Sequence, residues 1–528
     1  MTTTTRPSPA VPLSRLSPDE RYERFDDLQR RMKPVWEGLD RDLEDGSVVV
    51  VPSVTLDRAV TYSGSLTQAY EERYLFLLLL LRHPRLRMVY VTSMPIAPTI
   101  VEYYLALLPG VIPSHARARL SLISVNDASP QSLSAKLLAR PRLLARIGAL
   151  VPNREHCHLI PYNTTPLERD IALSLDIPMY GADPRLADLG TKTGCRRIFS
   201  AVGVPHPQGA EDLHDLDELG AAICSMRSAN PAITEVIVKL NEGVSGEGNA
   251  LVDLRNVPPP GDATEPEAVA GRLMQMQLES PQTPFSAYVA KFEERGGVVE
   301  ERICGDDLRS PSVQLRVVPG GEVELLSTHD QLLGGASGQS YLGCVFPADP
   351  AYSSTISEQA TRVGKLLARE GVLGRFAVDF VVVRAPDGSW RSYAIEINLR
   401  KGGTTHPFLT LQFLTDGRYD QRLGVFMTRD GREKHLVATD HLESPQLRGL
   451  TIDDLFDIVA RHGLHYDQSR QAGIVFHMIS SLTEHGRVGL TAVGDTAPEA
   501  QATYERAEQV LLAEGRAALE ESPLPPSG

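Results

Sequence analysis

Residues 375–407 read RFAVDFVVVRAPDGSWRSYAIEINLRKGGTTHP, and the fold can be inferred outward from this segment. Asp387-Gly388 predicts a tight hairpin turn, because both residue types tolerate positive φ. A hairpin centred there pairs Asp379 directly with Glu396, with the two Cβ atoms about 4.5–5.5 Å apart. Asn398 lies two residues beyond Glu396 and is expected on the same face of the sheet. The other face is expected to belong to the core and carries Val378, Phe380, Val382, Tyr393, Ile395 and Ile397.

Directly opposed carboxylates destabilise a sheet, so a chain that places them there is expected to supply a cation. Two carboxylates and a carboxamide oxygen are hard ligands that suit Mg²⁺, or Mn²⁺ in its place, held jointly with substrate phosphates. The competing interpretation is a solvated hairpin face. Residues 400–403 (Arg-Lys-Gly-Gly) add cationic groups and a tight loop beside the pair, which favours a metal site for phosphoryl chemistry. The predicted metal ligands are Asp379, Glu396 and Asn398.

A second candidate segment lies upstream, where residues 236–249 read VIVKLNEGVSGEGN. A β-branched strand presents Lys239 and then enters a glycine-rich loop. Glycines let backbone N–H groups approach phosphate oxygens, and a lysine adds a point charge. The order of residues is not that of a Walker A loop, and a plain hairpin turn remains an alternative. The loop residues predicted to contact phosphate are Gly243, Ser245, Gly246 and Gly248.

Two weaker candidates flank this loop. Lys192 precedes a predicted helix that ends near Gly203, and a solvated surface lysine is the competing interpretation. Residues 298–307 (VVEERICGDD) form an apolar strand that runs into an acidic bend. Backbone groups at such a bend can pair with adenine, and a carboxylate can bind ribose hydroxyls, although an ordinary strand end is the alternative.

Composition narrows the class of protein. The net charge of −14 over 528 residues argues against a nucleic-acid or anionic-membrane binder. Five cysteines without a CxxC motif indicate a reducing cytoplasm. The first 18 residues are polar and rich in Thr, Pro and Ser, unlike a signal peptide. The longest apolar run, residues 74–81, is far shorter than the roughly 20 residues that span a bilayer. A cytoplasmic protein is therefore expected; one sequence does not decide between a monomer and a homo-oligomer.

The pattern along the chain predicts three folded units between two disordered tails (1–18 and 516–528). Residues 19–180 alternate strand-like and helix-like segments, which predicts a Rossmann-like parallel α/β domain without a dinucleotide fingerprint. Residues 181–430 favour antiparallel hairpins, and residues 431–515 a small α+β unit. The predicted strands of the first domain are 48–51, 88–92, 120–125 and 157–160; its predicted helices include 68–81 and 132–147.

The ordered set of segments resembles the ATP-grasp superfamily, which has two lysines, a glycine-rich flap, an acidic adenine hinge and a paired-acid metal site ending in an E-x-N-x-R run. The resemblance covers about residues 181–430 and includes the run Glu396-Ile-Asn398-Leu-Arg400. It implies that Lys192 and Lys239 hold the α- and β-phosphates of ATP. It also implies adenine contacts at Glu300 and the backbone of Ile303, a ribose contact at Asp307 with Asp306 as rival, and catalytic roles for Arg400, Lys239 and Arg316.

A narrower resemblance is to the pheganomycin-type peptide ligases, in which a pre-ATP-grasp domain and a characteristic C-terminal domain flank the core. It rests on the first α/β domain, on residues 329–348 (HDQLLGGASGQSYLGCVFPA) and on residues 438–444 (ATDHLES). The resemblance implies a Mg²⁺- and ATP-dependent ligase that joins a carboxylate to an amino-acid or peptide amine through an acyl phosphate. The alternatives are a small-molecule kinase on the same fold and a noncatalytic nucleotide-binding protein. His406 is a candidate general base, with a packing or capping role as its competing interpretation.

Overall fold

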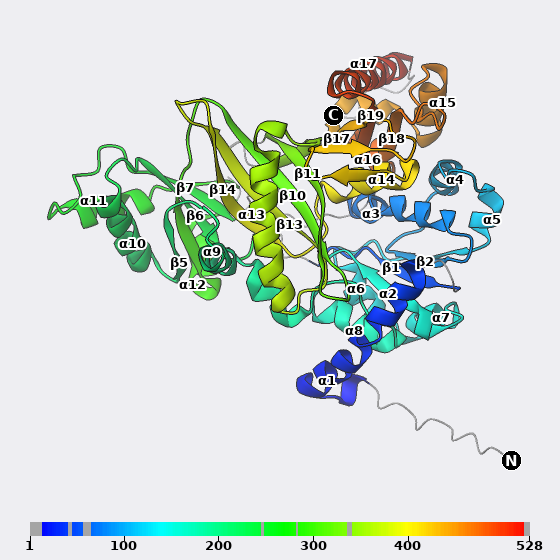
Figure 1. Ribbon diagram of the computed structural model, residues 1–528, viewed down its shortest axis with the longest axis horizontal. Helices are drawn as coiled ribbons and strands as arrows, with labels where there is room; N and C mark the ends of the chain where they lie inside the picture. The colour runs from blue at the N-terminus through cyan, green and yellow to red at the C-terminus, as the bar shows by residue number, and fades with distance from the viewer. Residues whose placement is uncertain are drawn as a thin grey trace.

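A computed structural model of the chain describes residues 13–40, 45–55, 65–243, 248–280, 283–334 and 340–521. Its elements form three regions (Figure 1): a lobe at the left of the view, a central sheet with its covering helices, and an N-terminal α/β unit at the right. In the part of the chain that the structure describes, no helix is long and apolar enough to cross a membrane.

The N-terminal unit is built on a four-stranded parallel sheet in the order β3-β2-β1-β4. Every residue of β1 is buried, as expected of a parallel strand covered on both faces. The predicted α/β class of this unit is confirmed. Its strands are β1 (Ser47–Val51), β2 (Arg87–Thr92), β3 (Leu120–Ser124) and β4 (Cys157–Pro161); its helices are α1 (Pro18–Gln29), α2 (Met32–Asp40), α3 (Ser65–Glu72), α4 (Pro98–Ala106), α5 (Pro113–Arg117), α6 (Leu133–Leu138), α7 (Pro141–Ala149) and α8 (Pro166–Leu175), with 3₁₀ turns η1 (Leu13–Arg15), η2 (Leu75–Arg82) and η3 (Arg154–His156).

Two segments of this unit that were predicted as single helices are each divided in the structure. The segment 68–81 breaks at Arg73 and Tyr74 into α3 and the 3₁₀ helix η2, because the polar residues at the break are buried in contacts with distant parts of the chain. The segment 132–147 divides into α6 and α7 at Pro141, since the preceding Arg140 leaves helical geometry at φ −126° and ψ 71°. The predicted N-terminal tail is also too long, because Ser17 already caps α1.

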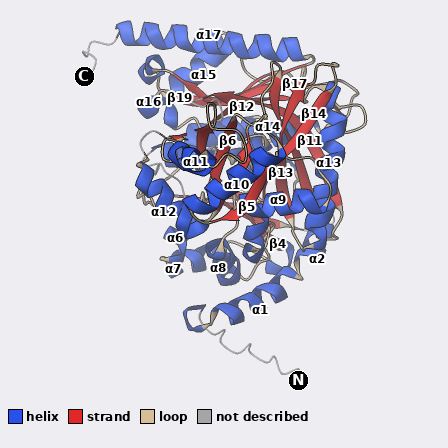
Figure 2. Ribbon diagram, turned by 90° about the vertical axis from the view of Figure 1, so that its left-hand side faces the viewer, coloured by secondary structure: helices blue, strands red, loops and turns tan. Residues whose placement is uncertain are grey.

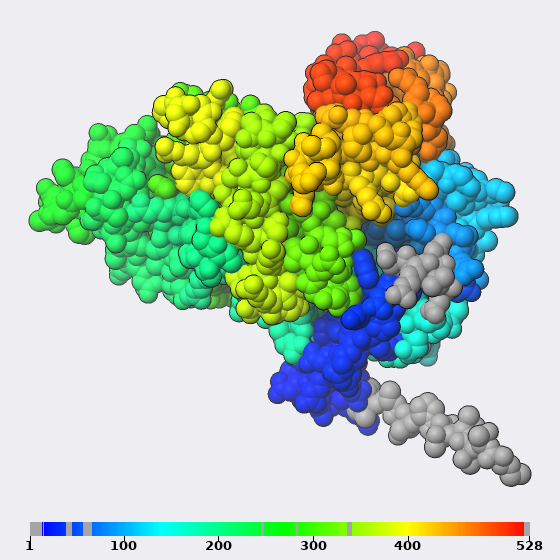
Figure 3. Space-filling view, viewed as in Figure 1, coloured from blue at the N-terminus to red at the C-terminus, as the bar shows by residue number. Residues whose placement is uncertain are grey.

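The left-hand lobe carries a five-stranded sheet in the order β5-β9-β6-β7-β8. Figure 3 shows this lobe, in green, projecting from the body of the molecule. One side of the sheet packs on helices to form a separate hydrophobic core around Val236, Val238 and Val252. The elements are η4 (Pro184–Gly190), α9 (Lys192–Ala201), β5 (Gly209–Leu213), α10 (Leu216–Ala229), β6 (Glu235–Leu240), β7 (Asn249–Asp253), α11 (Glu265–Leu273), β8 (Gln277–Leu278), α12 (Phe285–Arg295) and β9 (Gly297–Glu301).

An eight-stranded sheet in the order β14-β13-β10-β11-β12-β17-β19-β18 runs through the centre of the molecule. The long helix α13 lies across its face (Figure 1) and buries Ile356, Ala360 and Val363 against it. The elements are β10 (Leu308–Val317), β11 (Val323–Gly334), β12 (Ser340–Phe346), α13 (Pro350–Arg369), β13 (Gly374–Arg384), β14 (Trp390–Asn398), α14 (Thr405–Thr415), β15 (Arg418–Asp420) and β16 (Val425–Met427).

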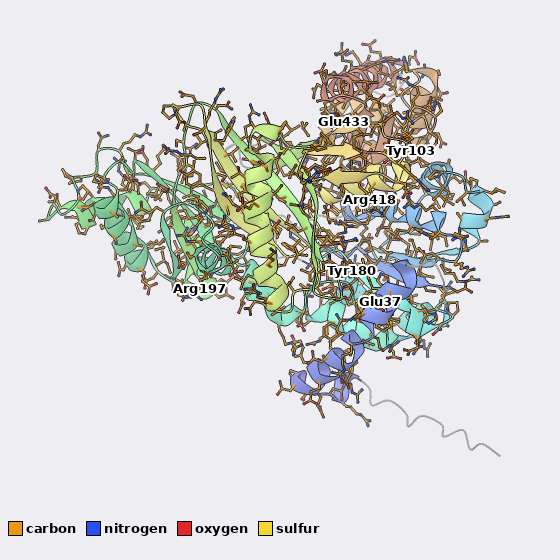
Figure 4. The ribbon with its side chains drawn as sticks, viewed as in Figure 1. Glu37, Tyr103, Tyr180, Arg197, Arg418 and Glu433 are labelled. Carbon is orange, nitrogen blue, oxygen red and sulfur yellow. The ribbon has the colours of Figure 1, made fainter. Side chains whose placement is uncertain are left out.

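The C-terminal unit continues this sheet, because β12 pairs with β17 from Gly343↔Thr439 to Phe346↔Leu436. It also shares one hydrophobic core with the N-terminal unit. At that junction Tyr103, labelled in Figure 4, stacks on Phe456 with ring centroids 5.0 Å apart and accepts a hydrogen bond from the Phe476 backbone N–H (2.8 Å). The elements are β17 (His435–Glu443), η5 (Pro445–Gly449), α15 (Ile452–Arg461), β18 (Gly473–His477), α16 (Ser481–His485), β19 (Arg487–Gly494) and α17 (Ala497–Glu521).

Helix α17 lies along the outer edge of the C-terminal unit, at the top of Figure 2. It runs to Glu521, so the C-terminal tail predicted from residue 516 is wrong over residues 516–521. Residues 522–528 of that tail lie outside the described residues.

Candidate active site

A cavity of about 890 Å³ lies where the left-hand lobe, the central sheet, the N-terminal unit and the C-terminal unit meet. Lys239 and Glu300 line it from the lobe, and Asp379 and Glu396 from the central sheet. Its wall is completed from further parts of the chain by Arg73, Tyr162, Tyr341, Arg400 and Asp440. Most of the residues singled out from the sequence therefore face a single space.

Asp379 and Glu396 are Cα partners on the adjacent strands β13 and β14, as predicted. Asn398 also faces the cavity and donates a hydrogen bond from Nδ2 to Asp379 Oδ2 (2.9 Å). Burial, reinforced by the like charge of Glu396, raises the pKa of Asp379 from 3.8 to about 6. The two carboxylates and the amide thus form a cluster in which one negative charge lacks full compensation.

The register at the site is right, but the predicted turn that led to it is wrong. Residues 386–388 form a three-residue loop, closed by the Ala385 backbone N–H donating to the Ser389 carbonyl (2.8 Å). Arg384 pairs with Trp390, and an irregularity between Asp379 and Phe380 then shifts the register by one residue. The shift restores the Asp379–Glu396 pair. Between the turn and Glu396, the residues of β14 that face the core are those predicted to face away from it. Ser392 and Ala394 are buried there, and the prediction of Tyr393 and Ile395 as core residues is wrong.

Lys192 meets the carboxylate pair from the opposite wall. It is the first residue of α9, capped by Thr191, and its Nζ lies 2.6 Å from Glu396 Oε1. Burial opposes its charge, but the Glu396 carboxylate together with Cys195 and Glu300 outweighs that effect, and the pKa of Lys192 is raised. The same contact, against the effect of burial, lowers the pKa of Glu396. Lys192 therefore stabilises the charge of Glu396 while Asp379 has no lysine or arginine within ion-pair distance in the described residues.

Lys239 and Glu300 form a buried ion pair (2.5 Å) between the neighbouring strands β6 and β9. Arg196 donates to the second oxygen of Glu300 (2.9 Å). Burial disfavours the Glu300 charge, but the two cations outweigh it and lower the pKa of Glu300. Both carboxylate oxygens therefore have protein partners, and the carboxylate fixes Lys239 toward the cavity. The next residues, Glu301 to Ile303, also line the cavity.

Arg400 lies directly beyond the E-x-N segment and lines the same cavity. Its Nη1 lies 3.3 Å from the Tyr162 hydroxyl and 3.4 Å from the Lys401 carbonyl, and among the described residues it forms no ion pair with a carboxylate. A half-buried guanidinium with so little neutralisation is suited to bind an anionic group of a ligand.

Several predicted residues are not part of this group. Arg316 pairs with Glu324 (2.6 Å) at the far end of β10, and its guanidinium lies over the Trp36 ring. Asp307 accepts a hydrogen bond from Arg309 (3.3 Å) and is absent from the described cavity wall. Gly243 and Gly248 line the cavity. The predicted phosphate contacts Ser245 and Gly246 lie outside the described residues.

The sequence analysis missed the wall contributed by other units: Arg73 and Tyr162 from the N-terminal unit and Asp440 from the C-terminal unit. Arg73 stands just before a run of leucines, and no local motif marks it. The candidate base His406 is buried behind this wall, where its Nε2 lies 3.0 Å from His477 Nε2. Burial lowers the pKa of His406 to about 3, which favours a neutral imidazole.

Comparison with known proteins bears directly on this site. A family model described as "IQCH-like, ATP-grasp" matches residues 184–271 and 268–422, the region that supplies both lysines and the carboxylate pair. A second model, "PGM1 C-terminal domain", matches residues 454–507. Residues 184–422 therefore match an ATP-grasp domain family.

Two curated relatives align with most of this chain. It is 29% identical over 450 residues to an L-propargylglycine–L-glutamate ligase of Streptantibioticus cattleyicolor, covering 84% of this chain and 89% of the relative. It is 23% identical over 474 residues to IQ motif-containing protein H of Danio rerio, covering 81% of this chain but only 44% of that protein. The predicted resemblance to ATP-grasp peptide ligases is confirmed, and the relationship to a ligase supports the predicted ATP-dependent ligase function.

Solved structures confirm the fold class. An ADP complex of N5-carboxyaminoimidazole ribonucleotide synthetase aligns with a TM-score of 0.50 at 10% identity, covering 90% of this chain and 98% of the other. An ATP complex of biotin carboxylase from Campylobacter jejuni aligns with a TM-score of 0.52 at 13% identity, covering 92% and 96%. At these identities the likeness shows the fold, and no more.

Proposed function

We propose that this ATP-grasp protein is an ATP-dependent carboxylate–amine ligase that forms an amide through an acyl phosphate. The observation that carries the proposal is the opposed pair Asp379–Glu396, held by Lys192 and Asn398 in a cavity that Arg400 and Lys239 also line. Together these groups offer metal ligands, phosphate-binding cations and a largely unneutralised guanidinium, the set that phosphoryl transfer to a carboxylate requires.

The donor set fits Mg²⁺. Asp379, Glu396 and Asn398 would hold it, because hard oxygen ligands suit this ion and Asn398 donates to Asp379 through nitrogen, leaving its amide oxygen unused by that bond. The raised pKa of Asp379, caused by burial and by the charge of Glu396, supports a cation at this position. When bound, the ion neutralises the phosphates of ATP; Mn²⁺ would fit the same ligands.

The two lysines are assigned to the phosphates. Lys239 is fixed by Glu300, and Lys192 is held by Glu396, so each presents a positive charge at a defined place in the cavity wall. The backbone near Ile303 is assigned to adenine, with Ile237 and Leu308 as apolar walls that also line the cavity. Glu300 orients Lys239 in this account. Asp307 remains a weaker candidate for ribose, and Arg316 for the γ-phosphate, since neither lies in the described cavity wall.

The reaction needs two displacement steps. An oxygen of the substrate carboxylate attacks the γ-phosphorus in line, the bond to the β-phosphate oxygen breaks, and ADP leaves. The amine then attacks the acyl carbon, phosphate leaves, and the amine loses a proton. Arg400 stabilises negative charge on the transferring phosphoryl group and on the tetrahedral intermediate, and positioning by the lysines supplies much of the remaining acceleration.

The substrates belong to two classes, an amino-acid-like carboxylate and an amino-acid or peptide amine. The relationship to a protein named L-propargylglycine–L-glutamate ligase supports these classes. The proposal also includes a cytoplasmic location, where ATP is supplied, and domains over 19–180 (pre-ATP-grasp), 181–430 (ATP-grasp core) and 431–515 (C-terminal). The ATP-grasp core and the C-terminal domain share one sheet, so the boundary between them is a position in the chain and does not separate two independently packed units.

The test is an assay of purified protein with Mg-ATP and pairs drawn from amino acids and short peptides, following ADP, phosphate and product mass. Ligation predicts ADP, phosphate and a product lighter by one water than its two parts. ADP with a phosphorylated product would instead establish a kinase. Absence of both ADP formation and Mg-ATP binding would refute the proposal. Asp379→Asn serves as the inactive control and the exposed turn variant Asp387→Asn as the matched active one.

A further inference from the structure

The end of the cavity on the side of the N-terminal and C-terminal units is built around Arg73. This residue stands at the break between α3 and η2, where the predicted continuous helix is interrupted. Its guanidinium carbon lies 5.2 Å from the Tyr70 ring centroid and 6.0 Å from that of Tyr162, and all three residues line the cavity. The break therefore presents a cation within an aromatic wall.

Only one edge of the Arg73 guanidinium is used by the protein. Nη1 donates to Asp440 Oδ2 (2.7 Å), and the two side chains are 7% and 3% exposed. Nε is buried without a hydrogen-bond partner, and in the described part of the chain Arg73 forms no further hydrogen bond or ion pair. A buried N–H without a partner costs about 1–3 kcal/mol, so a ligand that accepts from it is favoured. The edge formed by Nε and Nη2 has the fork geometry that binds a carboxylate through both oxygens.

Asp440 fixes Arg73 and has little capacity left for a ligand. Its Oδ1 lies 2.8 Å from His477 Nε2 and 3.2 Å from His406 Nε2, while Oδ2 accepts from Arg73. The Asp440 backbone carbonyl accepts from Arg487 Nε (2.8 Å). A carboxylate held at so many points from α14, β18 and β19 sets the direction of the guanidinium.

Two arginine side chains flank the Tyr162 ring. The guanidinium carbon of Arg400 lies 5.9 Å from its ring centroid, and that of Arg73 lies 6.0 Å from it. Asp440 neutralises Arg73, and among the described residues no carboxylate forms an ion pair with Arg400. This end of the cavity therefore favours an anion and disfavours an ammonium group.

We propose that the Nε–Nη2 edge of Arg73 binds the free carboxylate of the amine substrate, which is a free amino acid, and that Asp440 is the positioning residue for Arg73. The inference rests on the proposed function. The donor's carboxylate is consumed when it is phosphorylated beside Arg400, and an amino-acid donor keeps an ammonium, which Arg73 would repel. An amino-acid acceptor keeps its carboxylate one carbon away from the attacking amine, so both groups can lie between Arg400 and Arg73.

The test compares each L-amino acid that wild-type protein accepts as amine substrate with its α-carboxamide, which keeps the amine but lacks the charge. Wild type is expected to prefer the free acid by about 10²-fold or more in kcat/KM, because the carboxamide leaves a buried cation unpaired. Arg73→Gln is expected to reduce this ratio to within a few fold of one by raising KM for the acid, with KM for ATP unchanged. Arg73→Lys keeps the positive charge but loses the forked guanidinium, so its preference for the acid over the carboxamide is expected to lie between those of wild type and Arg73→Gln.

Two further variants separate recognition from folding. Arg227→Gln breaks the buried Arg227–Glu265 pair in the lobe, away from the cavity wall, and is expected to keep the full preference. Asp440→Asn is expected to raise KM for the acid more than it lowers kcat, because Arg73 loses its orientation. A general folding defect would lower turnover with acid and carboxamide alike, which thermal midpoints would reveal.

The outcomes distinguish this inference from the proposed function. Equal use of acid and carboxamide by wild type, or an unchanged preference in folded Arg73→Gln, would overturn the role of Arg73; so would a preference for peptides with a blocked C-terminus. Should wild type ligate no pair, the proposed function fails. Calorimetric titration of the twenty L-amino acids and their α-carboxamides into ADP-loaded protein then tests Arg73 as a carboxylate-binding residue. Binding of a free acid that Arg73→Gln abolishes supports this role. If no amino acid binds in this way, the role is overturned.

Discussion

Replacing Asp379 with Asn is expected to stabilise the metal-free and nucleotide-free protein while abolishing its activity. Burial and the opposed Glu396 raise the pKa of Asp379 from 3.8 to about 6, so at pH 7.5 the folded protein holds a carboxylate in an unfavourable charged state. At 1.36 kcal/mol per pKa unit, asparagine removes a penalty of about 2–3 kcal/mol. For a unit of this size the change corresponds to a rise in Tm of roughly 4–10 °C.

The sign of the pH dependence provides a second check on the same variant. A raised carboxyl pKa means that the penalty is absent below pH 3.8, develops as the pH rises, and is complete above about pH 6. The Tm advantage of Asp379→Asn should therefore be full at pH 7.5 and reduced at pH 5. Glu396→Gln should act in the opposite direction, lowering stability by about 1–3 kcal/mol, because the partly buried ammonium of Lys192 then loses its charged partner.

The assay is thermal unfolding in EDTA at both pH values, repeated with Mg-ATP. With Mg-ATP the order of wild type and Asp379→Asn should reverse, since only wild type gains full binding energy. A lower Tm for Asp379→Asn than for wild type in EDTA at pH 7.5 would refute the reasoning that Asp379 is a carboxylate held against its own stability.

Further outcomes are expected at three other positions. Arg400→Ala should lower kcat by about 10²–10³ with the fold intact, because one preorganised cationic contact is worth about 2.7–4 kcal/mol. Arg391→Ala, an exposed site on the preceding strand β14, is the control, and near-normal turnover by Arg400→Ala would exclude Arg400 from catalysis. Lys239→Met should raise KM for ATP by about 10–100-fold, from the loss of one charged hydrogen bond; an unchanged nucleotide Kd by fluorescence titration would contradict the phosphate assignment. Burial lowers the pKa of His158 to about 4, so this residue contributes stability above its ordinary pKa of 6.5 that is lost as the pH falls toward 4. Relative to His158→Phe, wild type should lose about 2 kcal/mol between pH 7.5 and pH 5 in chemical denaturation, and parallel pH profiles for the two proteins would contradict this.

Local patterns were sufficient to predict the centre of the site. The alternation around Asp379 and Glu396 predicted the paired acids and Asn398 on one face, and the residues that follow predicted Arg400 beside them. The register was correct because two deviations cancel: the loop is one residue longer than the predicted turn, and a shift next to Asp379 restores the pairing. Sequence alone gives no means of seeing a compensating bulge, which is why Tyr393 and Ile395 were assigned to the wrong face.

Residues whose role depends on distant packing could not be predicted in the same way. Arg73 and Asp440 are 367 positions apart and meet only because the N-terminal and C-terminal units share a core. The helix predicted over 68–81 fails for the same reason, since contacts of Glu71, Glu72 and Arg73 with other segments override local helix propensity. Arg316 and Asp307 were assigned from their order in the chain, but Arg316 pairs with Glu324 and Asp307 with Arg309, and neither lies in the described cavity wall.

The acyl phosphate is the central claim, and isotope transfer tests it most directly. A carboxylate substrate labelled with ¹⁸O in both oxygens is ligated with Mg-ATP, and the phosphate released is examined by mass spectrometry. If the carboxylate attacks the γ-phosphorus and the amine then displaces phosphate, one ¹⁸O atom must appear in each phosphate formed. Unlabelled phosphate would contradict the account, and ¹⁸O found in AMP instead would show that the carboxylate is activated by adenylation.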